Sequence, residues 1–432
     1  MTETTQAPTT GKSKLSEAAY LVLGLIMMPF AFLISPKFVI QSFKDGNRET
    51  LSAPETRSRI TFETINKTPS QIRLNDVREL VCELVDDHDW LTLSDLIQDW
   101  DQARAAAPDG TRLSRYALTV VCEAVSDGVI EGNVCHPLDI PYIPDETAHY
   151  FEGVASNHPT CYPLAAICAY LRICQGWTGR GSEYAQYVSI DSWGVMERHF
   201  KRAIWLLEPH DAKQLDAPLL ASVRFDLLAF LPNAETLVHQ YYNDWSTLDP
   251  ADQEPHHCYG FMLLPRWFGS YTLLEDAAQK AYAATHNITD AAAYATLYLA
   301  ALPLEIGLAL HLDLDLFLNG VSDLVHQSGN DPAVLAYLVQ ETPMSFCVPL
   351  RSGLTREEKT QIRDMAKTVD TFCHHLTRTR MTAIHPDSWQ DGVDEALDYI
   401  SEGLIAEMAE GHRFLMGPHG IEIVQNDPPS LG

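Results

Sequence analysis

Residues 71–100, QIRLNDVRELVCELVDDHDWLTLSDLIQDW, decide the fold of this chain. Apolar residues in the first half recur at spacings of three and four: Leu74, Val77, Leu80, Val81 and Leu84. That spacing places them on one face of a helix. The pattern breaks at DDHDW and resumes at Leu93, so the stretch predicts two antiparallel helices joined by a short turn.

Segments of about one helix length recur down the chain. Examples are CYPLAAICAYLRICQGW at 161–177, AETLVHQYYNDW at 234–245 and DAAAYATLYLAAL at 290–302. Between them lie short stretches rich in proline, asparagine and aspartate, the residues typical of helix caps and stops. No fixed residue period connects the segments. The sequence therefore predicts an all-α fold of helical hairpins, arranged as an irregular, tetratricopeptide-like α-solenoid or as a bundle.

The pattern divides the chain into five regions. Residues 45–70 are polar and lack helical periodicity, which indicates a linker. The last stretch, 412–432, also lacks a helical pattern. We expect a disordered leader at 1–14, a hydrophobic helix at 15–44, the linker, a helical-repeat domain at 71–350, and a C-terminal helical extension at 351–432 with an irregular tail.

The N-terminal hydrophobic run predicts a membrane anchor. Residues 18–34 carry no charge, and a span of about twenty residues is reached by 18–40 if Lys37 extends to the headgroups. Alternatives are a cleaved signal peptide, a wedge bent at Pro29 that enters one leaflet, and a buried helix of the globular body. More basic residues follow the run than precede it, so we expect the inner or cytoplasmic membrane with the large domain in the cytoplasm.

Composition excludes some functions. The 58 acidic and 30 basic side chains give a formal net charge of −28, which repels nucleic acid. Nine cysteines occur without a C-x-x-C pair, a usage that indicates buried thiols in a reducing compartment.

Signatures of catalysis and of cofactors are weak. The glycines of GWTGRGS at 176–182 follow a predicted helix, whereas a dinucleotide loop follows a strand, so a turn between helices is expected. Weak metal candidates are His256, His257 and Cys258, and also His374 and His375 beside a cysteine. Adjacent helical residues point about 100° apart, so neither run predicts a zinc site on its own. We expect no metal and no cofactor.

Four residues are the candidates for a binding site or a structural corner: Arg180, Trp193, Arg266 and Trp267. Tryptophan and arginine are the residue types most enriched at binding hot spots, although aromatic residues at helical spacing usually belong to the core. Arg266 and Trp267 lie in LLPRWFGS at 263–270, where Ser270 is placed to cap the next helix.

Residues 168–285 resemble a bacterial family known as domain of unknown function 4034. The likeness lies in the order and spacing of residues 179–181, Trp193, Pro255 and residues 264–267. Phe268 stands where a second glycine is expected, which puts a tight corner there in doubt. The resemblance implies an all-helical, repeat-like body, and the family has no assigned activity. The sequence thus predicts a membrane-tethered helical-repeat protein that binds a protein or peptide, with an enzyme whose pocket lies in the central helices as the alternative.

Overall fold

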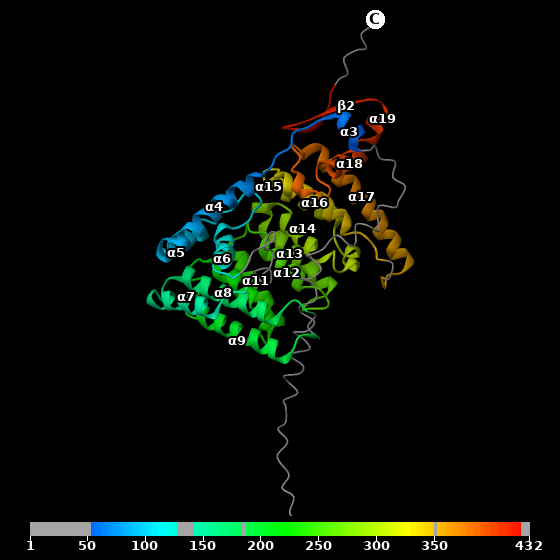
Figure 1. Cartoon of the computed structure of the whole chain (residues 1–432). Helices are drawn as coiled ribbons and strands as arrows, with labels where there is room; N and C mark the ends of the chain where they lie inside the picture. Colours follow the sequence, from blue (N-terminus) through cyan, green and yellow to red (C-terminus); the bar gives the residue numbers. More distant parts are fainter. Residues whose placement is uncertain (1–52, 128–141, 184–186, 350–351, 425–432) are drawn as a thin grey trace, which may run out of the picture.

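The computed structural model describes residues 53–127, 142–183, 187–349 and 352–424, and most of them are helical, as the sequence predicts (Figure 1). The helices of the first half are α3 (Ala53–Arg59), α4 (Pro69–Asp86), α5 (Trp90–Gln102), α6 (Leu113–Ala124), α7 (Asp145–Asn157), α8 (Tyr162–Arg180), α9 (Ile190–Leu207), α10 (Pro218–Asp226) and α11 (Ala234–Leu248). Those of the second half are α12 (Glu254–Met262), α13 (Tyr271–Thr289), α14 (Ala292–Ala301), α15 (Leu314–Gln327), α16 (Pro332–Met344), α17 (Arg356–Arg380), α18 (Val393–Gly403) and α19 (Ile405–Ala409).

The first hairpin forms where the sequence predicts it. Thr68 starts α4 with a capping box, in which its hydroxyl accepts from the Gln71 N–H and the Gln71 side chain accepts from the Thr68 N–H. The chain turns at His88, whose φ of 57° lies in the left-handed region, and Asp89 then caps α5. The apolar faces of both helices enter the core through Val77, Val81, Leu93 and Ile97.

Later helices pack mainly on their neighbours in the chain. Helix α8 lies between α7 and α9, α12 and α13 both pack on α14, and α14 to α17 pack one on the next. Helix α8 is buried along nearly its whole length. The buried apolar residues form one connected core that runs from the first helices to the last.

The two ends of the described chain meet in a small sheet, shown at the top of Figure 1. Strand β1 (Ile60–Thr61) pairs in parallel with β2 (Arg413–Gly417), and β2 pairs antiparallel with β3 (Gly420–Val424). Ile60 lies opposite Phe414, and both are buried. The predicted irregular tail is therefore wrong over 413–424. Burial alternates along β2 and does not alternate along β3, and both strands have only five residues, so the sequence pattern is too weak to predict them.

The predicted linker at 45–70 is also wrong in its described part. Beyond α3 and β1, the Ile65 N–H donates to the Ile384 carbonyl at 2.9 Å. The Ser70 hydroxyl donates to Asp331 Oδ2 at 2.7 Å, and helix α3 packs against α18. The polar residues of this segment are thus held by partners about 260 residues or more away in the chain, which local pattern cannot predict.

The hydrophobic helix predicted at 15–44 lies outside the described residues, as does the leader at 1–14. Within the described ranges, no helix combines the length and the apolar character that crossing a bilayer requires.

Candidate functional site

Two glycines bring α8 and α9 into close contact. A Cβ on Gly176 would lie 2.7 Å from the ring of Phe200, and a Cβ on Gly179 would lie 2.3 Å from Val195 Cγ1. Both glycines are inside α8, so the turn predicted for 176–182 is wrong at its first positions, and the helix ends at Gly181 with a φ of 81°. The glycines serve the contact between the helices, and this close packing brings the end of α8 onto the start of α9.

At that end, Arg180 lies between two tryptophans. Its guanidinium carbon is 6.0 Å from the ring centre of Trp177 and 5.2 Å from that of Trp193, distances typical of cation–π contacts. The structure therefore brings together two of the four predicted residues, Arg180 and Trp193, from neighbouring helices. All three side chains are buried, and Arg180 is 4% exposed.

Arg180 has an incomplete set of hydrogen bonds. Its Nη1 donates to the carbonyl of Gly181 at 2.7 Å. Its Nε and Nη2 are buried and have no hydrogen-bond partner within the described part of the chain. Burial lowers the pKa of Arg180 to about 10, so the guanidinium remains charged at neutral pH.

The other end of the same hairpin carries exposed aromatic and basic side chains. Trp205 in the last turns of α9 is 56% exposed, and the guanidinium carbon of Arg202 lies 4.0 Å from its ring centre. Arg202 is held in place by Glu152 of α7, which accepts from its Nη2 at 2.7 Å. Arg198 and Lys201 are exposed on the same helix. The sequence does not predict this surface, because apolar spacing alone does not show which face of α9 remains exposed to solvent.

The other predicted pair, Arg266 and Trp267, forms a corner between α12 and α13. Arg266 Nη2 donates to the carbonyl of Leu304 at 2.6 Å and lies 3.4 Å from Glu305 Oε2. Trp267 is half-buried, with its ring centre 5.6 Å from that of Phe261. This pair belongs to a different helical hairpin from Arg180 and Trp193.

The backbone of this corner is tight, despite Phe268. A Cβ on Gly269 would lie 2.0 Å from the carbonyl oxygen of Leu263. The Ser270 hydroxyl accepts from the Leu273 N–H at 3.1 Å and caps α13, as the sequence predicts. These contacts fix the backbone between α12 and α13, so the corner has a structural role.

A cavity of about 490 Å³ lies beside the corner, next to Tyr271 and Glu305. The Tyr271 hydroxyl donates to Glu305 Oε1 at 2.9 Å, and Arg266 approaches the other oxygen of the same carboxylate. Glu305 is therefore engaged on both oxygens.

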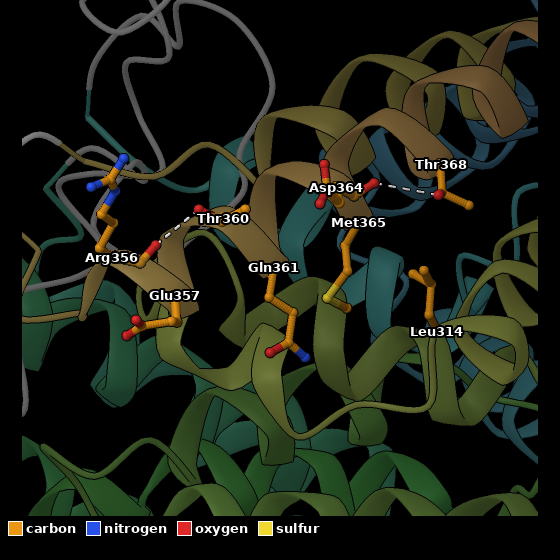
Figure 2. A pocket seen from close by; sticks show the side chains of 8 residues that line it. All are labelled: Leu314, Arg356, Glu357, Thr360, Gln361, Asp364, Met365 and Thr368. Atoms are coloured by element: carbon orange, nitrogen blue, oxygen red, sulfur yellow. Dashed lines mark hydrogen bonds between the residues drawn. The ribbon is translucent and has the colours of Figure 1, made fainter.

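A groove of about 780 Å³ runs along α17 (Figure 2). Its lining side chains come from one face of that helix, except for Leu314 at the start of α15. Figure 2 shows the hydroxyls of Thr360 and Thr368 bonded to carbonyls of the helix itself. Most of its lining residues are polar or charged, and they include no cysteine or histidine.

A buried ionic network joins the first helices to the central ones. Arg112 donates to both oxygens of Asp249, and Arg115 Nη2 donates to both oxygens of Asp226. Arg115 Nε also donates to Glu254 Oε1 at 3.0 Å. The space enclosed beside these groups measures about 10 Å³, enough for one water molecule at most. The network therefore holds helices together and leaves no room for a substrate.

Three carboxyl groups at this junction titrate unusually high. Burial raises the pKa of Asp101 and of Asp226 to about 6. Burial, with the nearby Glu254 carboxylate, raises the pKa of Asp252 to about 7. The free energy of unfolding should therefore depend on pH between about 4 and 7.

The two weak metal candidates lie on different helices. His256 and His257, with Cys258, are on α12, whereas His374 and His375 are on α17. His256 Nδ1 and the Tyr242 hydroxyl are hydrogen-bonded at 2.9 Å, and burial lowers the pKa of His256 to about 4. Among the described residues, no three His, Cys, Asp or Glu side chains gather in an arrangement that could hold a metal ion.

Comparisons of the chain with models of protein families, with curated proteins and with solved structures find no match. The function proposed below therefore rests on the contacts of this chain alone.

Proposed function

We propose that this chain is a non-catalytic interaction protein that binds a protein or peptide partner on the outer face of α9. The observation that carries the proposal is the exposed indole of Trp205, held by Arg202 at 4.0 Å. An exposed tryptophan fixed by an arginine has the composition of a binding hot spot, because such a pair gains a large buried area without losing much side-chain freedom.

The surroundings of Trp205 indicate the charge of the partner. Helix α9 packs on α8 and α10, and its exposed positions include Arg198 and Lys201. The whole chain carries a formal net charge of −28, and Arg198 and Lys201 lower the repulsion of a negatively charged partner locally, although Lys201 also pairs with Glu197 at 2.6 Å. We infer a partner surface with acidic side chains around an apolar pocket for the indole.

The finer architecture and the location belong to the same proposal. Helices that pack mainly on their neighbours in sequence favour an irregular α-solenoid of the tetratricopeptide-like kind. The apolar run at 18–40 supports attachment to the inner or cytoplasmic membrane, with the large domain on the cytoplasmic side. We also propose that residues 168–285 are related to domain of unknown function 4034.

The test is affinity capture after crosslinking, with two variants of the full-length protein. Trp205→Ala removes the proposed anchor, whereas Ile288→Ala removes a side chain of similar exposure, 55%, on α13. We expect a partner that is enriched by the wild type and by Ile288→Ala and lost with Trp205→Ala. Equal capture by all three proteins would overturn the α9 site.

The membrane half of the proposal has its own test. Cell fractionation of the full chain is compared with that of a chain lacking residues 1–44. We expect the full chain with the membranes and the shortened chain in the soluble fraction. A full chain that is soluble would overturn the tether and leave the α9 site untouched.

A further inference from the structure

We propose that Arg180 binds the carboxylate of a ligand, which its Nε and Nη2 hold as a fork between Trp177 and Trp193. This site is distinct from the outer face of α9. Gly179 of α8 lies against Val195 of α9, so Arg180 is at the start of α9, whereas Trp205 is near its end. The inference therefore goes beyond the proposed function and is tested separately from it.

The geometry of the Arg180 guanidinium suits a carboxylate. Nε and Nη2 lie on the same edge of the planar group and present two parallel N–H bonds, which match the two oxygens of a carboxylate. Arg112 of this chain uses the same two atoms, which donate to Asp249 at 2.6 and 2.9 Å. In Arg180 these two atoms are the ones without a hydrogen-bond partner in the described part of the chain.

Three other arginines with little solvent exposure pair with carboxylates, whereas Arg180 pairs with none in the described part of the chain. Arg112 pairs with Asp249, Arg115 with Asp226 and Glu254, and Arg172 with Glu152 and Asp145. Each therefore has a carboxylate that compensates its buried charge. Among the described residues, no carboxylate forms an ion pair with Arg180, which is 4% exposed. A buried, uncompensated charge destabilises a fold, so its presence points to an anion that completes the site.

The surroundings favour a carboxylate over a phosphate. The fork supplies one positive charge, which balances one negative charge, whereas a phosphate dianion needs further cations. Arg180 is the last residue of α8, and the partial negative charge of a helix C-terminus disfavours a dianion there. The aromatic rings of Trp177 and Trp193 lie 6.0 and 5.2 Å from the guanidinium carbon, so the group that carries the carboxylate should be apolar or aromatic.

The probes are chosen to separate charge from shape and a small acid from a peptide. Thermal unfolding of the full chain is measured with benzoate, with neutral benzamide of the same shape, and with inorganic phosphate. A short peptide ending in phenylalanine is added with a free C-terminal carboxylate and, separately, with an amidated one. Arg180→Met removes the charge and keeps the length of the side chain. Arg73→Met removes an exposed arginine of α4, outside both proposed sites, and serves as the control.

We expect benzoate or the free-carboxylate peptide to raise the unfolding temperature by about 3 °C at saturation, because a ligand that binds the folded state alone stabilises it. Benzamide and the amidated peptide should have no effect. The rise should disappear in Arg180→Met and persist in Arg73→Met. A shift with benzoate but not with the peptide assigns a small acid, and the reverse assigns a chain end.

Three outcomes would overturn the site. The first is an equal shift of Arg180→Met and the wild type by benzoate. The second is the absence of any shift with every carboxylate probe. The third is a shift with phosphate that exceeds the shifts with the carboxylates. Loss of the α9 partner in Trp205→Ala, or its retention, has no bearing on any of them.

Discussion

Arg112, which precedes α6, and Asp249, which follows α11, form a two-pronged ion pair with N···O distances of 2.6 and 2.9 Å. The side chains are 12% and 2% exposed, so both charges are largely removed from water. The pair joins residues 137 positions apart and fastens the first helices to the central ones.

Breaking this pair from one side should strongly destabilise the protein. Arg112→Met leaves Asp249 buried and unpaired, and we expect it to lower the free energy of unfolding by about 3–5 kcal/mol. The double variant with Asp249→Leu should recover most of that loss, because no charge is then left buried. Urea denaturation measures both. Lys367→Ala, which breaks an exposed pair with Asp364, is the control and should change little. Equal losses in the single and double variants would contradict the assignment.

Gly269→Ala should destabilise the corner between α12 and α13. The added methyl would lie 2.0 Å from the Leu263 carbonyl oxygen, so the backbone must shift, at a cost of about 1–3 kcal/mol. Gly194→Ala is the matched control, because its Cβ would meet nothing within 4 Å and it lies inside α9. The control should gain about 0.5–1 kcal/mol in the free energy of unfolding. Similar effects of the two changes would show that the corner is looser than described.

The stability of the protein should depend on the ionisation of Asp252. Its pKa of about 7 in the folded state exceeds the ordinary value of 3.8, so the folded protein holds this proton more tightly than the unfolded chain does. The stability that the proton contributes is therefore fully present below about pH 4 and is lost as the pH rises to 7. Asp252→Asn carries no such proton and should not share this loss.

Urea denaturation of wild type and Asp252→Asn between pH 4 and 8 tests this expectation. Relative to the wild type, the variant should gain roughly 2–4 kcal/mol over the range from pH 4 to 7 and then stay level. A constant difference between Asp252→Asn and the wild type over this pH range would contradict the raised pKa of Asp252.

Phe414→Ala should loosen both ends of the described chain together. Phe414 is buried opposite Ile60 in the parallel pairing of β1 and β2. Its truncation should remove about 3–5 kcal/mol of local stability. In hydrogen exchange, the amides of Ile65 and of residues 413–424 should lose protection to the same extent. Loss in 413–424 alone would show that the N-terminal segment is held independently of the sheet.

The sequence predicted the helices well because the apolar spacing and the capping residues of each helix lie within a few turns of one another. The hairpin at 71–100 and the cap at Ser270 depend on residues three or four positions apart, which a sequence displays directly. The sheet was missed because its strands are short and its parallel pairing joins Ile60 to Phe414, far away in the chain. A partner at that distance leaves no local signal.

The residue types of the candidate site could be predicted from the sequence, but their arrangement in space could not. Arg180 and Trp193 stand out in the sequence as residue types of binding sites, and the structure places them 5.2 Å apart. Their contact depends on Gly176 and Gly179, which a local pattern of glycines assigned to a turn. Two nitrogens of Arg180 lack hydrogen-bond partners among the described residues, and Trp205 is exposed. Both features depend on how the helices pack together, which local sequence patterns do not predict.

The most direct test of the central claim is the stability of Arg180→Met in the absence of any ligand, compared with Arg172→Met. Arg172 is buried and paired with Glu152, so its loss should lower the free energy of unfolding by about 3–5 kcal/mol. If Arg180 is kept for an anion that binds to it, Arg180→Met should be at least as stable as the wild type, because it removes a buried charge that has no counterion. A loss in Arg180→Met as large as that in Arg172→Met would contradict the claim and make Arg180 a structural residue.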